Sequence, residues 1–209
     1  MGVHLPPELQ NLFTERRADI RQRLADFAAV KPKDRFYELC FCLLTPQSSA
    51  VHADIVVRAL KAIDYQLVGQ NVLHLLREPE CYIRFHNVKH ARLAIAREAW
   101  PEITAVIERS DLEVRERRDL LARTVNGFGL KEASHFLRNI GVRGLAIIDR
   151  HLLTNLVRCG VYGSIPPLNT ARAYREVEDR YSSFCNDIGI DMDEVDLLFW
   201  CAQTGHIFK

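Results

Sequence analysis

Lys131 and Asp149 are the two side chains whose types and positions could support covalent chemistry. Lys131 falls in the first turn of a predicted helix, where the helix dipole disfavours a positive charge. If that amine is also partly desolvated against an aromatic ring, it loses its proton more easily and can attack a sugar carbon. An exposed lysine that extends into solvent is the alternative interpretation.

Asp149 follows the apolar run Leu145–Ile148 and directly precedes another predicted helix, which is the position of an N-cap. A carboxylate held there beside an amine nucleophile could stabilise positive charge that develops on a deoxyribose ring. The capping role and the catalytic role are compatible.

Residues 119–151 predict how these two side chains are positioned: a helix, a tight turn, a second helix, a short loop and a third helix. The first two helices carry apolar rows that can pack together as an αα-hairpin. The turn between them, Gly127-Phe128-Gly129, has two positions without a Cβ atom. Its amides precede a helix N-terminus and could bind a phosphate, although a plain tight turn explains the glycines equally well.

Helical spacing of apolar residues continues along almost the whole chain, and no segment has a convincing strand pattern. The Gly and Pro positions divide the chain into about nine or ten short helices. Residues 36–44 are apolar on every side and predict a central buried helix. The fold class is therefore all-α.

The composition, 48% hydrophobic and 26% charged over 209 residues, is that of one or two globular domains and excludes disorder as the main state. No apolar run approaches the ~20 residues that span a bilayer. The first residues lack the features of a secretory signal, so we expect a cytoplasmic protein.

The formal net charge is only +1, but its distribution is uneven. Residues 82–97 contain four Lys or Arg and no acidic residue. In residues 187–196, by contrast, every charged side chain is acidic. A basic stretch of this kind is either a nucleic-acid site or a solvated helix face.

The six cysteines are widely and irregularly spaced, with no CxxC pair. Neither a zinc site nor an iron-sulfur cluster is expected from such spacing, and we expect reduced, buried thiols.

Residues 126–141, NGFGLKEASHFLRNIG, and residues 145–153, LAIIDRHLL, resemble the helix-hairpin-helix DNA glycosylase superfamily. More narrowly, they resemble its archaeal-type 8-oxoguanine DNA glycosylase/AP lyase branch. Residues 39–45, 85–92 and 197–200 extend the resemblance over most of the chain. Endonuclease III shares the hairpin but usually carries a four-cysteine cluster that this sequence cannot supply.

The resemblance implies a role for each matching residue. Lys131 matches the lysine that attacks C1′ of the damaged nucleotide, expels the base and forms a Schiff base with the opened sugar. Asp149 matches the aspartate that supports this attack. β-Elimination from the Schiff base then nicks the strand 3′ to the lesion.

The resemblance also implies a pocket for a flipped-out base. Phe85 and Trp200 match the two aromatic walls, and Lys209 matches a terminal lysine near the oxidised purine. Gln47 matches a residue that either enters the gap left in the duplex by the flipped base or contacts a base edge. Its turn, Pro46-Gln47, departs from the branch, which more often has alanine-asparagine there.

DNA backbone contacts follow from the same resemblance. The turn residues Gly127, Phe128 and Gly129 match a hairpin whose amides hold phosphate and whose carbonyls often bind a monovalent cation. Four further residues are expected phosphate partners, namely Arg84, Lys89, Arg92 and Arg150.

The implied architecture is two helical subdomains with the active site in the cleft between them. Residues 46–140 would form a bundle that ends in the hairpin, and residues 1–45 plus 141–209 the other subdomain. We expect a monomer with no cofactor and no catalytic metal, acting at the nucleoid on double-stranded DNA that contains 8-oxoguanine or an abasic site.

Two alternatives stay open: the same scaffold directed at oxidised pyrimidines, and a non-catalytic helix-hairpin-helix DNA-binding module. The role of His135, one helical turn after Lys131, is also open between packing and catalysis.

Overall fold

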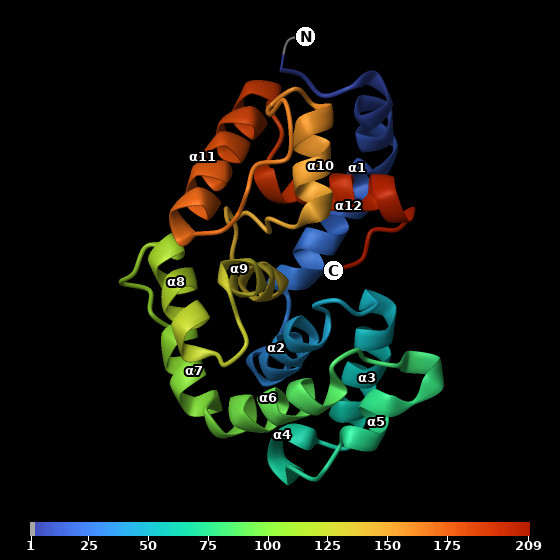
Figure 1. The fold of residues 1–209 in the computed structure, drawn as a ribbon, viewed down its shortest axis with the longest axis vertical. Coiled ribbons are helices and arrows are strands. Elements are labelled where there is room, and N and C mark those ends of the chain that lie inside the picture. Colours follow the sequence, from blue (N-terminus) through green and yellow to red (C-terminus); the bar gives the residue numbers. More distant parts are fainter. Residues whose placement is uncertain (1–2) are drawn as a thin grey trace. The chain divides into compact units, whose positions relative to one another are not determined.

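The computed structural model describes residues 3–209, and over this range the protein is helical without a strand. Twelve α-helices lie in these residues, more than expected because α4 and α5 are only four and five residues long. The all-α prediction is confirmed. The helices are α1 (Pro7–Ala28), α2 (Arg35–Leu44), α3 (Ala50–Ala62), α4 (Tyr65–Val68), α5 (Leu73–Arg77), α6 (His86–Glu98), α7 (Trp100–Ile107), α8 (Val114–Thr124), α9 (Leu130–Asn139), α10 (Arg150–Arg158), α11 (Ala171–Ile188) and α12 (Met192–Thr204) (Figure 1).

The chain divides into two compact units. The middle unit is Val30–Phe136, and the terminal unit is the chain up to Ala29 together with Leu137–Lys209. The boundaries we expected from the sequence, at residues 46 and 140, differ from these. Helix α2 packs against α3 and α6, so residues 30–45 belong to the middle unit.

The core of the middle unit forms around α2, as its apolar sequence predicts. Phe36, Leu39 and Phe41 are completely buried. The ring of Phe36 packs edge-on against Trp100, with centroids 5.3 Å apart, and stacks on Tyr65. The buried rings of α2 form the core against which α3 and α6 pack.

The core of the terminal unit forms where α1 and α12 pack against each other; the two helices cross in the view of Figure 1. α10 and α11 also pack against α12. Two side chains of α11 hold the segment before α10. Tyr174 Oη donates to the carbonyl of Ala146 at 2.7 Å, and Glu178 Oε1 accepts from the amide of Ala146 at 3.0 Å. This segment leads directly into Asp149.

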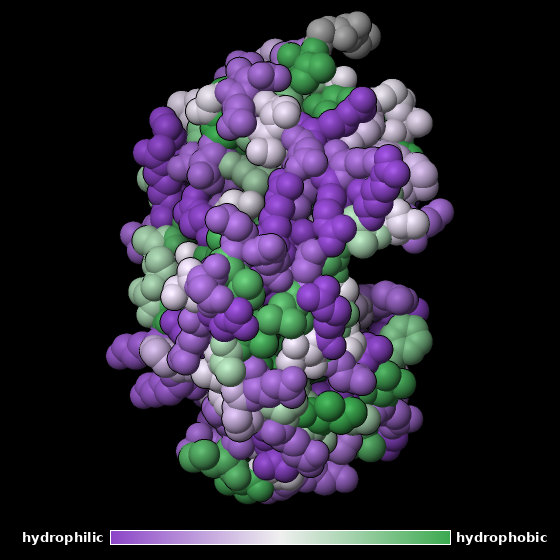
Figure 2. All heavy atoms as spheres, turned by 90° about the vertical axis from the view of Figure 1, so that its left-hand side faces the viewer, coloured by the Kyte–Doolittle hydropathy of each residue, from purple (hydrophilic) through white to green (hydrophobic). Residues whose placement is uncertain are grey.

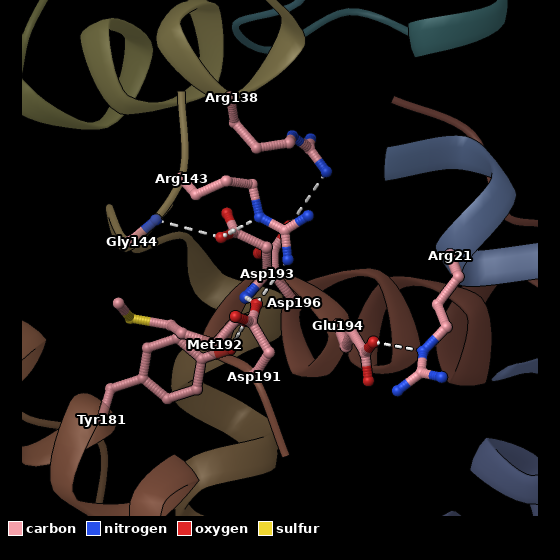
Figure 3. Close-up of polar contacts among 10 residues, drawn as sticks. All are labelled: Arg21, Arg138, Arg143, Gly144, Tyr181, Asp191, Met192, Asp193, Glu194 and Asp196. Atoms are coloured by element: carbon pink, nitrogen blue, oxygen red, sulfur yellow. Dashed lines mark hydrogen bonds and ion pairs between the residues drawn. The ribbon is translucent and has the colours of Figure 1, made fainter. Parts of the chain in front are cut away.

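The acidic stretch 187–196 has an internal structural role in the same unit (Figure 3). Arg143 pairs with Asp191 at 2.7 Å and with Asp193 at 2.8 Å, and Asp193 also accepts the Gly144 amide. Burial raises the pKa of the Asp193 carboxyl despite these contacts. Arg143 thus forms two ion pairs within the terminal unit.

The face drawn in Figure 2 is mostly hydrophilic, with scattered hydrophobic residues between the charged ones. Within residues 3–209 no helix combines the length and the apolar character needed to cross a membrane.

Candidate active site

The predicted helix, tight turn and helix are present as α8, the hairpin turn at residues 126–129, and α9. Gly127 adopts φ of 95°, a region that favours glycine. A Cβ atom at this position would lie 2.5 Å from Cδ and Nε of Arg92. The glycine therefore serves both the backbone conformation and the close approach of an arginine.

The amides of Phe128 and Gly129 in the hairpin turn have acceptors within the chain. The amide of Phe128 donates to the Val125 carbonyl at 3.0 Å, and the amide of Gly129 donates to Oε2 of Glu132 at 3.1 Å. The ring of Phe128 packs against Phe136 with centroids 6.2 Å apart. A phosphate at the hairpin turn would have to share or replace the carboxylate at Gly129.

Lys131 lies in the first turn of α9, as predicted, with 27% of its side chain exposed. Its Nζ is 3.6 Å from Oε1 of Glu132, the same carboxylate that accepts the Gly129 amide. The amine is therefore partly desolvated and placed at the end of the hairpin turn. His135, one turn later, is buried with its ring edge-on to Phe41.

Asp149 is the N-cap of α10, as predicted. Its Oδ1 accepts the amide of Leu152 at 2.8 Å, and the hydroxyl of Tyr174 accepts the preceding Ile148 amide at 3.3 Å. These contacts hold the carboxylate at the positive end of the helix dipole. Arg150, one of the expected phosphate partners, is exposed in the first turn of the same helix.

Gln47 and Phe85, two candidates for contact with the base, share an unusual backbone geometry. Both adopt φ of 58°, and both are exposed, Phe85 to 53%. The guanidinium of Arg84 lies over the Phe85 ring at 5.6 Å. Arg84 is itself exposed, so an aromatic ring and a cation are presented together.

Lys89 corrects one sequence-based expectation. We expected it to contact a DNA phosphate, but only 2% of the residue is exposed. Its ammonium donates to the carbonyls of Leu44 and Pro46 and to the hydroxyl of Ser48. All three N–H groups are used within the fold, so the charge does not face solvent.

Trp200 and Lys209 lie in the terminal unit, both half-buried. The Trp200 ring contacts the ring of His151 edge-on, with centroids 5.3 Å apart and planes at 81°. Nδ1 of His151 is hydrogen-bonded to Oε1 of Gln203. A histidine two residues after Asp149 thus orients the expected base-stacking tryptophan.

The candidate residues divide between the two units. Lys131, Gln47 and Phe85 belong to the middle unit, and Asp149 and Trp200 belong to the terminal unit. Sequence reasoning missed Ser48, Glu132 and His151. A signal for Glu132 was present, because an acidic residue three positions after a capping residue is the pattern of a capping box.

The described residues contain no cluster of side chains suited to hold a metal ion. Among residues 3–209, no three or more His, Cys, Asp or Glu side chains gather to hold a metal ion. The six cysteines are buried, and burial raises the pKa of Cys185 to about 12 and that of Cys159 to about 11. Thiols of this kind act as apolar core groups.

Comparison with known proteins agrees with this geometry. The family model described as "8-oxoguanine DNA glycosylase" matches residues 20–190, and the chain belongs to this family. The resemblance inferred from the sequence is thereby confirmed.

Individual relatives match along nearly their whole length. An "8-oxoguanine DNA glycosylase/AP lyase" of Fusobacterium nucleatum is 34% identical, covering 97% of this chain and 96% of the relative. The crystal structure of the Methanocaldococcus jannaschii 8-oxoguanine glycosylase/lyase, in complex with 15mer DNA containing 8-oxoguanine, is 29% identical with a TM-score of 0.84. The match covers 96% of this chain and 97% of the Methanocaldococcus jannaschii chain.

Proposed function

We propose that this chain is a bifunctional DNA N-glycosylase/AP lyase of base-excision repair that removes 8-oxoguanine from duplex DNA. The observation that carries the proposal is the partly buried Lys131 at the end of the hairpin turn, in a chain that belongs to the 8-oxoguanine DNA glycosylase family. The Methanocaldococcus jannaschii protein, crystallised with DNA that contains this lesion, supports the choice of substrate.

Lys131 is the nucleophile in this proposal. Its unprotonated Nζ donates a lone pair to C1′ of the damaged nucleotide, and the bond from C1′ to the base breaks. The base leaves with that electron pair and takes up a proton. Opening of the sugar ring then converts the C1′ adduct into a Schiff base with Nζ.

Strand cleavage follows from the Schiff base. Loss of a proton from C2′ sends electrons toward the C3′–O bond, which breaks and releases the 3′ phosphate. Asp149, held at the start of α10, stabilises the positive charge that develops on the sugar during base loss. Water then hydrolyses the imine and frees Lys131.

Base recognition is assigned to four of the residues predicted from the sequence. Phe85 and Trp200 stack on the flipped base, a kind of contact worth ~1 to 3 kcal/mol per base. Gln47 enters the gap or contacts a base edge, and Lys209 recognises the oxidised purine. His151 and Gln203 support Trp200 through their contacts with each other and with its ring.

Backbone binding is assigned to the hairpin turn and to three exposed or half-buried arginines, Arg84, Arg92 and Arg150. The carbonyls of Val125 and Gly129 each accept one amide and keep a second lone pair, so this turn has the hard oxygen donors that suit a monovalent cation. Such an ion would help to neutralise a DNA phosphate. We propose that the protein needs no other cofactor and acts as a cytoplasmic monomer at the nucleoid.

Borohydride trapping tests the proposal. The chain is incubated with duplexes that carry 8-oxoguanine, thymine glycol or an abasic site, and Lys131→Gln is compared with the exposed control Lys61→Gln. We expect a covalent adduct on the 8-oxoguanine and abasic duplexes that Lys131→Gln abolishes and Lys61→Gln leaves unchanged. An adduct on the thymine glycol and abasic duplexes but not on the 8-oxoguanine duplex would favour the oxidised-pyrimidine alternative. DNA binding without any adduct would leave a non-catalytic module.

A further inference from the structure

The buried ammonium of Lys89 joins α6 to the end of α2. Its Nζ donates to the carbonyl of Leu44 at 2.6 Å, to the carbonyl of Pro46 at 2.7 Å and to Oγ of Ser48 at 3.0 Å. Leu44 is the last residue of α2, so its carbonyl belongs to the negative end of that helix dipole. Three N–H donors thus meet three oxygens around an ammonium whose residue is only 2% exposed.

Ser48 extends this connection to a second turn. Its Oγ accepts the Lys89 ammonium and also the backbone amide of Arg84, both at 3.0 Å. The turn at residues 45–49 and the turn at residues 82–85 are therefore fastened to one another through a single hydroxyl. Both turns lie in the middle unit.

Each of these turns presents one residue in the left-handed region. Gln47 and Phe85 both have φ of 58°, although neither is a glycine or an asparagine. Bulky residues adopt this conformation only where surrounding structure holds them in it. The Lys89 and Ser48 contacts supply that constraint next to both positions.

The charge on Lys89 is retained despite an electrostatic cost. Burial, followed by the nearby Arg92 and Arg84 charges, lowers the pKa of this amine from 10.5 to about 8. A methionine would fill similar volume without that cost, but it could not donate to three oxygens. The polar contacts of the ammonium, more than its bulk, distinguish the residue.

We propose that Lys89 and Ser48 are positioning residues that hold Phe85 and Gln47 in a fixed mutual geometry, Phe85 for stacking on the flipped-out base and Gln47 for its contact with the gap or with a base edge. The inference rests on the proposed function, because that function assigns Gln47 and Phe85 to the base. It predicts that the pair controls extraction of the base from the duplex and not the covalent step at Lys131.

The test compares Ser48→Ala and Lys89→Met with the control Lys61→Met, a substitution of an exposed lysine of α3 that pairs with Asp34. Single-turnover excision is measured on an 8-oxoguanine duplex, and strand nicking on a preformed abasic site, where no base has to be extracted. We expect excision to fall about tenfold or more in both variants, as displaced positioning groups cause. Nicking at the abasic site should change by less than about twofold in both variants. In the control Lys61→Met, excision and nicking should both change by less than about twofold.

Ser48→Thr provides the conservative rescue, because it restores the hydroxyl acceptor and should recover most of the excision. If Lys89→Met does not fold, Ser48→Ala and Ser48→Thr carry the test, since both keep the Lys89 bonds to the two carbonyls. Excision and nicking that fall in parallel, or excision that is unchanged in Ser48→Ala, would overturn the proposal.

Failure of the proposed function gives a different result, because the unaltered chain would then not excise 8-oxoguanine. In that case, 2-aminopurine fluorescence in an abasic duplex reports on base unstacking. A fluorescence rise with the unaltered chain that Ser48→Ala reduces would support the positioning role. An equal rise in both, or no rise in either, would refute it.

Discussion

The carboxylate of Glu132 lies 3.6 Å from the Nζ of Lys131 while its other oxygen accepts the Gly129 amide. One acidic side chain thus contacts both the proposed nucleophile and the hairpin turn that we assign to a DNA phosphate. A negative charge at that place opposes phosphate binding and stabilises the hairpin in the absence of DNA.

Glu132→Gln separates these two effects. The amide oxygen of glutamine can still accept from Gly129, so the free energy of unfolding should change by less than about 0.5 kcal/mol. Removal of the charge should tighten binding to undamaged duplex about two- to fivefold at low salt. Fluorescence anisotropy over a salt series measures this change, and weaker binding by the variant would contradict the assignment of the hairpin turn.

Gly127→Ala should damage the hairpin turn. The substitution imposes a side chain on a residue at φ of 95° and places its Cβ 2.5 Å from Arg92, so we expect a loss of about 1 to 3 kcal/mol in unfolding free energy. Weaker DNA binding should accompany the displacement of Arg92. Gly163→Ala is the matched control, since nothing lies within 4 Å of a Cβ there. Urea denaturation of both variants measures the difference, and equal stability would show that the turn tolerates a side chain.

Asp149→Asn should separate capping from chemistry. Asparagine caps a helix about as well as aspartate, so stability should stay within about 0.5 kcal/mol, whereas Asp149→Ala should cost about 1 kcal/mol. Both variants should lose excision by roughly a hundredfold because the negative charge is gone. Single-turnover rates and thermal unfolding measured together test this, and full activity in Asp149→Asn would leave only the capping role.

The pH dependence of stability should reveal the buried charge of Lys89. Its pKa is about 8 in the folded chain and 10.5 ordinarily, so between these values the unfolded chain binds more protons. The free energy of unfolding of the native chain should therefore rise with pH over this window, relative to Lys89→Met, by at most about 3 kcal/mol. Below pH 8 the difference should be flat. A difference that stays flat from pH 8 to 10.5 would show that the amine keeps its proton more tightly than its burial implies.

Local patterns in the sequence predicted the hairpin and the cap well. The glycines at 127 and 129, the apolar rows beside them and Asp149 before α10 each act over a few residues, so their structural consequences can be read from adjacent positions. The buried apolar helix α2 was predicted for the same reason.

Contacts between distant parts of the sequence account for what was missed. Lys89 looked like part of a basic surface, but its hydrogen-bond acceptors lie 41 to 45 residues earlier in the chain. Residues 30–45 were expected in the terminal subdomain, whereas the packing of α2 against α3 and α6 draws them into the middle unit. Periodicity shows that a helix has an apolar face but not which helix covers it.

Locating the covalent bond tests the central claim most directly. The chain is trapped with borohydride on an 8-oxoguanine duplex, digested, and analysed by tandem mass spectrometry for the peptide that carries the reduced sugar. We predict a single modified residue, Lys131. A sugar on the N-terminal amine or on another lysine, such as Lys89, would contradict the assignment of the nucleophile.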